Sequence, residues 1–563
     1  MTSIQIQGEH RTPPVYSYAS KEGLESDGST SDHEPDEYTS LLAASAPPAT
    51  GNLGNRSVSS LLDRYSDVRS TLKPKAKSTC LGRWCEPRWR SIYIMYFTMF
   101  LSAVTFSIVL SSIWPYLLQV DQVNATPFFL GWVIASYSFG QLVASPLFGF
   151  WADKRPTREP LLVAIVINVV FSLLYCYCGA IPSGVSGYII IVSRAMVGFG
   201  AAVAAIVRSY VSEATTEKER TGAMAGVSSA QALGFILGPA LGLAFVPLGS
   251  TGFVIEPIRF HFNVYTGPGY LSALMGVINV VLLFFFKEVK LSSTRDKKMR
   301  DRKVSPDHTL PLVTQRKYFD RCAAGTMIVL FFVVLFAFAV LETIAAPMSM
   351  DEFAWGKQQA ILYNNAFFAG LAVLAIATFI CIKFITKCVD ERVVLMVSLF
   401  LMAIGYFVLL PMGDTLPKVA ISWLDSPIST NSSVPWDNDN NLTHLEGVGC
   451  RDPPQSWCTY ISQIYLVQYI LALMLLAIGY PAGNLISYAI FSKILGPFPQ
   501  GTMMGILTAA GSLARALGPM CVTALYQHFG PTVTFSSVVG LMAAAILLLL
   551  FTSYRLKPYS SNS

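Results

Sequence analysis

The sequence predicts an all-α membrane protein with twelve transmembrane helices in two six-helix bundles. Composition is the first observation behind this prediction: charged residues make up 13% of the 563 residues and apolar residues 53%, whereas an ordinary soluble domain is about 25% charged. An internal repeat is the second, because the pattern of Gly222–Pro239 returns as Gly501–Pro519 about half a chain later. Such a repeat is typical of membrane proteins built from two related bundles.

Twelve apolar stretches are long enough to cross a bilayer, which takes about 20 mostly apolar residues per helix. They lie near 92–118, 128–150, 160–180, 187–211, 221–246, 267–286, 322–347, 358–382, 392–411, 461–491, 501–525 and 531–553. The predicted domain boundaries are a tail at 1–88, a first bundle at 89–287, a basic linker at 288–320, a second bundle at 321–555 and a C-terminal tail at 556–563. Because a long polar tail precedes the first stretch, that stretch is not a cleavable secretory signal.

Lysines and arginines concentrate in three places: just before the first span, at Lys154–Arg158, and in the linker at 288–320. By the positive-inside rule, these segments and both termini are predicted to be cytosolic. The formal net charge of +6 therefore reports membrane topology. It does not indicate a nucleic-acid partner, and the partner we expect for the spans is the lipid bilayer.

The loop at 413–460, between spans nine and ten, is predicted on the lumenal side. Asn431 and Asn441 each begin an Asn-X-Ser/Thr acceptor pattern, for which we expect glycosylation, although such triplets also arise by chance. Cys450 and Cys458 lie in the same loop, where an oxidising compartment permits a disulfide. We therefore expect a bridge between these two cysteines.

The tail at 1–88 is rich in Ser, Pro, Gly, Asp and Glu and is predicted to be disordered. Within it, Glu37 lies four residues before the pair Leu41 and Leu42. This spacing is typical of sorting signals for endosomes and lysosomes, which clathrin-adaptor-type sorting proteins read in extended segments. The alternative is a chance match, because short motifs have a high false-positive rate.

The stretch Gly149–Lys154 falls at the cytosolic junction of spans two and three and resembles the signature loop of the major facilitator superfamily. The predicted gating loop comprises Gly149, Asp153, Lys154, Arg155 and Arg158. Glycine there permits close helix approach, and we expect Asp153 to pair with the basic residues until the bundles rock. In the second half only Asp390–Arg392 retains the charges, so we expect an asymmetric gate.

Span four contains Arg194–Gly200, which resembles a second motif of the superfamily. An arginine in hydrocarbon costs at least about 2.5 to 3.5 kcal/mol, so Arg194 should face an aqueous cavity or a carboxylate. The alternative is a structural arginine bonded to backbone carbonyls. Arg208, nearer the cytosolic end, is expected to snorkel towards headgroups. Gly234–Gly242 in span five resembles a third motif, which helix packing through small residues also explains.

Glu342 in span seven and Arg515 in span eleven are both predicted in the lumenal half of the second bundle, where they could pair. The carboxylate could carry a proton, and the arginine could lower the cost of moving an anion; the alternative is a static ion pair. Uncharged polar residues predicted to line the pathway are Tyr137, Gln141, Gln231, Asn364, Asn365 and Asn484. Hydrogen bonds between helices are the alternative for each.

Three runs, Phe129–Tyr137, Gln231–Pro239 and Ser492–Pro497, resemble a lysosomal member of the superfamily, and the likeness covers nearly all of 88–555. The resemblance implies a lysosomal and late endosomal membrane protein that conducts chloride and influences lumenal pH and membrane potential. A proton-coupled carrier of a small organic or anionic solute, and a membrane scaffold, remain open. Because the spans hold no nucleophile–base or metal constellation, we expect no enzyme activity, cofactor or metal.

Overall fold

The computed structural model describes residues 86–110, 112–121, 127–182, 184–249, 252–255, 260–289, 320–355, 357–417, 450, 456–496 and 498–558. These residues belong to one compact unit, Ser78–Ser563. Several predictions fall outside the described residues: the disordered tail with its Glu37, Leu41 and Leu42 signal, most of the basic linker, and the acceptors Asn431 and Asn441.

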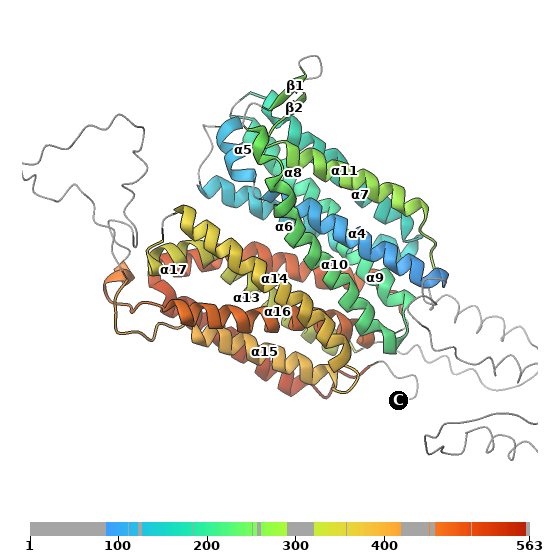
Figure 1. Ribbon diagram of the computed structural model, residues 1–563. Helices are drawn as coiled ribbons and strands as arrows, with labels where there is room; N and C mark the ends of the chain where they lie inside the picture. The colour runs from blue at the N-terminus through green and yellow to red at the C-terminus, as the bar shows by residue number, and fades with distance from the viewer. Residues whose placement is uncertain are drawn as a thin grey trace, which may run out of the picture. The chain divides into compact units, whose positions relative to one another are not determined.

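The first bundle contains α4 to α11, drawn from blue to light green in Figure 1. Its elements are α4 (Pro87–Leu110), α5 (Ile113–Val120), α6 (Pro127–Lys154), α7 (Arg158–Cys176), η1 (Tyr177–Ala180), α8 (Ser186–Gly200), α9 (Val203–Ala214), α10 (Glu217–Leu243), η2 (Val246–Leu248), β1 (Phe253–Ile255), β2 (Phe260–Phe262) and α11 (Gly267–Phe284). The two strands pair antiparallel, with Val254 opposite His261. α8 and α9 continue one another as a single candidate span, Ser186–Ala214.

The second bundle contains α13 to α17, drawn from yellow to red in Figure 1. Its elements are α13 (Arg321–Phe353), α14 (Lys357–Ile385), α15 (Glu391–Val408), η6 (Ser456–Thr459), α16 (Leu466–Leu495) and α17 (Gly501–Thr552). Asp320 is the N-cap of α13. Its side chain accepts hydrogen bonds from the backbone N–H groups of Cys322 and Ala323, which satisfies donors that have no partner within the helix.

Eleven helices of the described chain are long and apolar enough to span a membrane. The longest, α17, has 52 residues and would measure about 78 Å at 1.5 Å per residue, more than twice the bilayer core. Gly530 interrupts it with φ 77°, in the left-handed region that favours glycine, and Pro531 follows. The helix therefore counts as two spans, and the prediction of twelve transmembrane helices in two bundles is confirmed.

The predicted first span, 92–118, differs from the structure at both ends, because α4 begins at Pro87 and ends at Leu110 and a separate α5 begins at Ile113. Proline explains both limits. Pro87 fits the first turn of α4, where no helical N–H bond is lost. Pro115 is tolerated in the first turn of α5, but in one continuous helix its ring would clash with the carbonyl four residues earlier.

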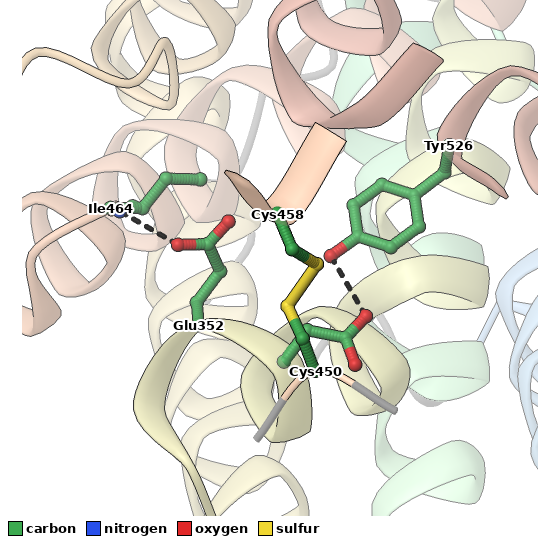
Figure 2. Close-up of a disulfide and its surroundings, with 6 residues drawn as sticks. Glu352, Cys450, Cys458, Ile464 and Tyr526 are labelled. Carbon is green, nitrogen blue, oxygen red and sulfur yellow. Dashed lines mark hydrogen bonds between the residues drawn. A yellow bond between two sulfur atoms is a disulfide. The ribbon is translucent and has the colours of Figure 1, made fainter. Parts of the chain in front are cut away.

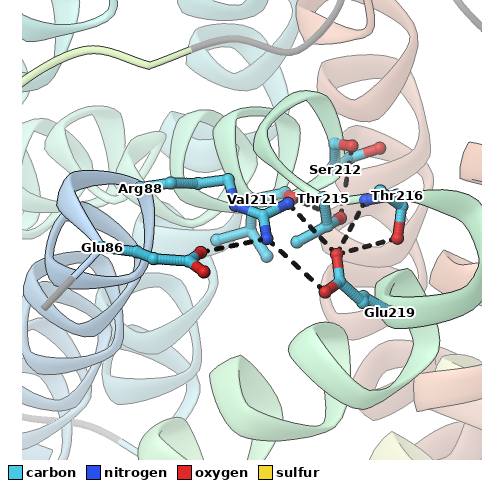
Figure 3. Close-up of polar contacts among 7 residues, drawn as sticks. All are labelled: Glu86, Arg88, Val211, Ser212, Thr215, Thr216 and Glu219. Carbon is cyan, nitrogen blue, oxygen red and sulfur yellow. Dashed lines mark hydrogen bonds and ion pairs between the residues drawn. The ribbon is translucent and has the colours of Figure 1, made fainter. Parts of the chain in front are cut away.

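The two bundles meet along α6 against α17 and α10 against α14. Glycines make the first contact possible: a Cβ on Gly149 would lie 2.2 Å from the Gly501 carbonyl oxygen, and one on Gly505 would lie 2.3 Å from that of Ser145. Within the first bundle, Arg88 at the start of α4 binds Glu219, which also accepts from the Thr216 hydroxyl at the start of α10 (Figure 3). Near these helix ends, paired charges thus act within the first bundle and backbone contact acts between the bundles.

Candidate functional site

A small cavity of about 40 Å³ lies where α17 meets the first bundle. Its lining residues are Met99, Ser102, Ala103, Thr105, Phe106, Tyr137, Gln141, Asn168, Val197, Ala201, Ala204, Gln231, Phe235 and Arg515. We call this space the central cavity. Of the predicted pathway residues it brings together Tyr137, Gln141, Gln231 and Arg515, which come from three helices. At roughly 10–15 Å³ per water, it has room for a few waters or one small ion.

Arg515 is the cationic residue of this cavity. It projects from α17, is half-buried, and its guanidinium carbon lies 5.9 Å from the centroid of the Phe106 ring on α4, in the other bundle. Glu342 is exposed and acts electrostatically on Arg515 and on Tyr480. The anticipated ion pair is not formed, since no oxygen of Glu342 lies within 4.0 Å of the guanidinium. Both charges therefore keep hydrogen-bonding capacity for other groups.

Gln141 and Gln231 are held in place by neighbours on both sides of the cavity. The Gln141 side chain accepts from Ser512 of the second bundle at 3.0 Å and donates to the Ala201 carbonyl at 3.3 Å. Gln231 accepts from Arg208 at 2.7 Å. These bonds orient the two amides towards the space that they line.

The snorkelling interpretation of Arg208 was wrong. Arg208 is only 3% exposed, and its guanidinium carbon lies 4.1 Å from the centroid of the Tyr488 ring on α16. A cation over an aromatic face is attracted by the ring quadrupole. Because Gln231 also holds this guanidinium, Arg208 stays between the bundles and never reaches the headgroups. The aromatic partner comes from the other half of the sequence, which is why no local pattern reveals it.

Arg194 on α8 meets neither a carboxylate nor a backbone carbonyl among the described residues. Its side chain is 2% exposed, its guanidinium carbon lies 5.4 Å from the centroid of the Tyr137 ring, and its Nε and Nη2 atoms are enclosed without hydrogen-bond partners. Of the sequence-based alternatives, a carboxylate and backbone carbonyls therefore fail, whereas an aqueous cavity beside Arg194 stays a prediction. Arg194 lies behind Tyr137, which lines the central cavity.

Two further pathway candidates, Asn364 and Asn484, lie away from the central cavity. Asn364 is buried inside the second bundle, where it donates to Ser349 and the Ala345 carbonyl and accepts from Tyr469, so the interhelical alternative describes it. Asn484 is half-buried on α16, and it does not line the cavity. The side chain of Asn365 lies outside the described residues.

Asp153 joins the two bundles, but through a partner other than the one we expected. Its carboxylate accepts from the backbone N–H groups of Gly501 and Thr502 and from the Thr502 hydroxyl, at 2.5 to 2.8 Å. A carboxylate is favoured at a helix N-terminus, where open N–H groups and the helix dipole attract it. The predicted pairing with neighbouring bases is wrong because the α17 N-terminus lies closer.

The basic residues of the gating loop stay on the surface of the first bundle. Lys154 Nζ lies 4.1 Å from the centroid of the Phe150 ring, and the Arg158 guanidinium carbon lies 5.1 Å from that of Phe284, while Arg155 is exposed. Cation–π contacts of this kind need only a nearby ring. The loop therefore contributes its glycine and its acid to the bundle interface and its bases to the surface.

More polar residues at the same end also join the bundles. Arg220 donates to the Ser492 carbonyl at 3.0 Å, Glu213 accepts from the Gln500 backbone N–H at 3.1 Å, and Thr221 donates to Glu391, which also pairs with Lys493 at 2.6 Å. We call this end the signature-loop end. Sequence reasoning missed these contacts, although the retained Asp390–Arg392 charges pointed to one of them through Glu391.

The opposite end holds the disulfide between Cys450 and Cys458, shown in Figure 2; we call it the disulfide end. Beside it, Glu352 at the end of α13 is 1% exposed and accepts from the Ile464 backbone N–H at 2.9 Å, while its Oε1 atom has no partner. Burial, and secondarily the adjacent Asp351 carboxylate, raise the pKa of Glu352 to about 7, although the Ile464 bond opposes this.

Among the described residues, no group of three or more His, Cys, Asp or Glu side chains is arranged to hold a metal ion. The polar groups that converge are instead amides, one phenol and one guanidinium group in the central cavity. Their geometry suits a hydrated or partly hydrated small solute, since they offer hydrogen bonds from several helices around one small space.

Comparison with known proteins relates this architecture to a large group. The family model described as Major Facilitator Superfamily matches residues 94–429. The Xenopus laevis protein named Major facilitator superfamily domain-containing protein 8 is 44% identical over 490 residues, which cover 85% of this chain and 93% of that protein. Multidrug resistance protein 2 of Bacillus subtilis is 29% identical over 160 residues, 28% of this chain and 35% of that protein.

Solved structures share the fold at low sequence identity. The human organic anion transporter MFSD10 (TETRAN) is 16% identical with a TM-score of 0.56, and the match covers 82% of this chain and all of that one. The proton:xylose symporter XylE is 13% identical with a TM-score of 0.58, covering 83% of this chain and 96% of that one. By its family match, its relatives and its two-bundle fold, the chain belongs to the Major Facilitator Superfamily of membrane transport proteins.

Proposed function

We propose that the protein is a channel that conducts chloride across the endolysosomal membrane through the central cavity between its two bundles, and so influences lysosomal pH and membrane potential. The observation that carries the proposal is Arg515, a half-buried guanidinium that lines a cavity with Tyr137, Gln141 and Gln231. An always-charged guanidinium at mid-span lowers the cost of bringing an anion into the membrane interior. The amides of Gln141 and Gln231 and the phenol of Tyr137 replace part of the hydration shell of the anion.

The choice of chloride follows from the resemblance of the sequence to a lysosomal member of the superfamily, and the cavity is compatible with it. About 40 Å³ accommodates a halide with a water or two. A bulky organic anion would need the bundles to move apart first.

A proton-coupled carrier of a small anionic or organic solute is the second candidate. Glu342 favours it, because this carboxylate is exposed and acts electrostatically on Arg515 without forming an ion pair with it. A coupled carrier needs a carboxylate near its anion site to carry the proton, and Glu342 is the carboxylate that acts on Arg515. Coupled carriage then requires Glu342 and Arg515 together, whereas conduction of chloride requires Arg515 alone.

Reversal potentials of the purified full-length protein in liposomes, measured across a chloride gradient at several pH values, test both candidates. We expect the reversal potential to follow chloride, and Arg515→Gln to reduce chloride current at least tenfold. If the reversal potential also shifts with the pH gradient and Glu342→Gln abolishes that shift, the carrier is correct. If wild-type protein and Arg515→Gln give equal fluxes, both are wrong and a scaffold becomes the better description.

The endolysosomal location is a separate proposal, based on the Glu37, Leu41 and Leu42 pattern in the tail. Adaptors recognise such a signal through an acidic residue and two leucines in an extended segment. Replacing Leu41 and Leu42 by alanine should move the protein to the plasma membrane, which surface biotinylation measures. Unchanged lysosomal delivery would show that this segment is not the sorting signal.

A further inference from the structure

Arg194 is a buried cation that cannot escape to solvent. Its side chain is 2% exposed, and α8 lies in backbone contact with α6 over the turn that follows it: a Cβ on Gly140 would lie 1.9 Å from the Ala195 carbonyl oxygen, and one on Gly198 would lie 2.0 Å from that of Tyr137. Helices packed this closely leave no path along which the side chain can snorkel. The charge is therefore fixed inside the first bundle.

No described acid neutralises this charge. The groups that act electrostatically on Arg194 are the phenols of Tyr175 on α7 and Tyr137 on α6. The buried Asp121 near the start of α8 accepts instead from the backbone N–H groups of Gly184 and Gly187. Because a guanidinium stays charged at every accessible pH, an uncompensated one in this position is strongly destabilising.

The unused hydrogen-bonding capacity of Arg194 lies on one edge of its guanidinium. Nε and Nη2 are the two nitrogens on the side-on edge of the guanidinium, whose N–H bonds run parallel, and both are enclosed without partners. The hydroxyl of Tyr175, a residue that acts electrostatically on Arg194, is enclosed too. It makes no hydrogen bond within 3.5 Å, although the Ser112 hydroxyl lies close to it. The two guanidinium nitrogens can only donate, and the phenol can donate to an anion as well. A small anion can therefore accept from all three groups, whereas a water would bring two donors of its own.

We propose that Arg194 and Tyr175 form an internal binding site for one small monovalent anion of halide size, held by the side-on edge of the guanidinium and the phenol O–H. The anion supplies the missing countercharge. This site adds a second anion position to the proposed chloride transport. It rests on that proposed function only for the route by which the anion arrives. It gives the first bundle an anion position of its own, separated from Arg515 by the Tyr137 ring.

Halide-dependent stability of the full-length protein tests this site. The protein carries Arg515→Gln, which removes the cation of the central cavity, and is held in nanodiscs at fixed pH and ionic strength. Its thermal unfolding midpoint is measured as chloride replaces gluconate. We expect a saturable rise in midpoint, since a ligand that binds only the folded state stabilises it. Arg194→Gln in that background should abolish the rise.

Two variants that each remove one tyrosine hydroxyl provide a matched comparison of chloride binding. Tyr175→Phe should raise the half-saturating chloride concentration about tenfold, the size expected when a hydrogen bond to a charged group is lost. Tyr116→Phe removes a hydroxyl from a ring packed 5.0 Å from that of Tyr175, and that hydroxyl bonds the Tyr175 carbonyl and the Gly179 N–H. It should leave the half-saturating concentration unchanged. If Arg194→Gln does not fold, this pair still decides the question.

Several outcomes would overturn the site: identical midpoints in chloride and gluconate, a chloride response that survives Arg194→Gln, or equal effects of Tyr175→Phe and Tyr116→Phe. In crystals soaked with bromide, the anomalous peak should lie against Nε and Nη2 of Arg194, and its absence counts against the proposal. If liposome flux shows no chloride transport while the halide response persists, the proposed function fails and the site stands. The reverse pattern rejects the site alone.

Discussion

At the residue scale, three arginines within the membrane spans have three different environments. Arg208 receives a hydrogen bond acceptor and a ring, Arg515 faces a cavity, and Arg194 is enclosed with two nitrogens unpartnered. The sequence predicted that all three arginines lie in spans, because each interrupts an apolar run. It could not assign their environments, since each environment is made by side chains from other helices.

Glu352 gives a residue-scale prediction about pH. Its pKa of about 7 in the folded protein exceeds that of an unfolded glutamate, so the folded state binds the proton more tightly. The stabilisation is complete below about pH 4.5, declines as the pH rises towards 7, and is lost above it. Glu352→Gln cannot ionise. We expect it to raise the unfolding temperature at pH 8 by several degrees and to change it little at pH 4.5.

Scanning fluorimetry of the full-length protein from pH 4.5 to 8 measures this effect. Asp414→Asn is the matched control, because it makes the same change from carboxyl to amide at an exposed residue near the same end. It should leave the pH profile of the wild-type protein unaltered. A Glu352→Gln profile parallel to that of wild type would mean that the buried carboxyl does not titrate in this range.

At the scale of the element, glycine spacing sets how closely the helices pack. α6 and α17 touch through Gly149 and Gly501 and again through Ser145 and Gly505. The repeat Gly222–Pro239 and Gly501–Pro519 predicted related helices, but in the structure Gly505 packs against backbone while Gly226 packs against the Tyr96 ring. The same sequence pattern therefore serves two different contacts, and only the fold distinguishes them.

Gly149→Ala should separate α6 from α17 at the signature-loop end. The new Cβ would overlap the Gly501 carbonyl oxygen, and overpacking of this kind costs about 1–3 kcal/mol. We expect hydrogen exchange of residues 501–505 to accelerate several-fold. Gly131→Ala is the control within the same helix, because a Cβ there meets nothing within 4 Å. Equal exchange in the two variants would show that this contact does not set the helix separation.

At the scale of the whole molecule, the hydrogen bonds described between the two bundles run from the signature-loop end, as at Asp153, to mid-span, where Ser512 donates to Gln141. Composition and apolar periodicity predicted the two bundles because burying twelve apolar stretches leaves few other solutions in a bilayer. They did not predict which end is joined. That depends on pairs such as Arg220 with the Ser492 carbonyl, which lie in different halves of the sequence.

Membrane topology gives a prediction for the whole chain. If the positive-inside reading holds, the 413–460 loop is lumenal and Asn431 and Asn441 carry glycans. Peptide N-glycosidase should then increase the gel mobility of protein expressed in mammalian cells, and the double change of both asparagines to glutamine should remove the shift. Asn55→Gln tests the opposite side, because that acceptor pattern lies in the predicted cytosolic tail. A shift that depends on Asn55 would reverse the topology.

Asp153 gives the last prediction, which concerns the balance between open and closed arrangements of the bundles. Its carboxylate accepts three hydrogen bonds at the α17 N-terminus, and loss of a negative charge at a helix N-terminus costs about 1 kcal/mol. Asp153→Asn should therefore shift the population towards molecules open at the signature-loop end by about fivefold. Spin labels at the exposed positions Arg155 and Lys387 report this as growth of the longer-distance population. Asp390→Asn, which breaks only a pair with Arg392 inside the second bundle, should leave the distribution unchanged; equal shifts in both variants, or none in either, would show that the carboxylate of Asp153 does not hold the bundles together.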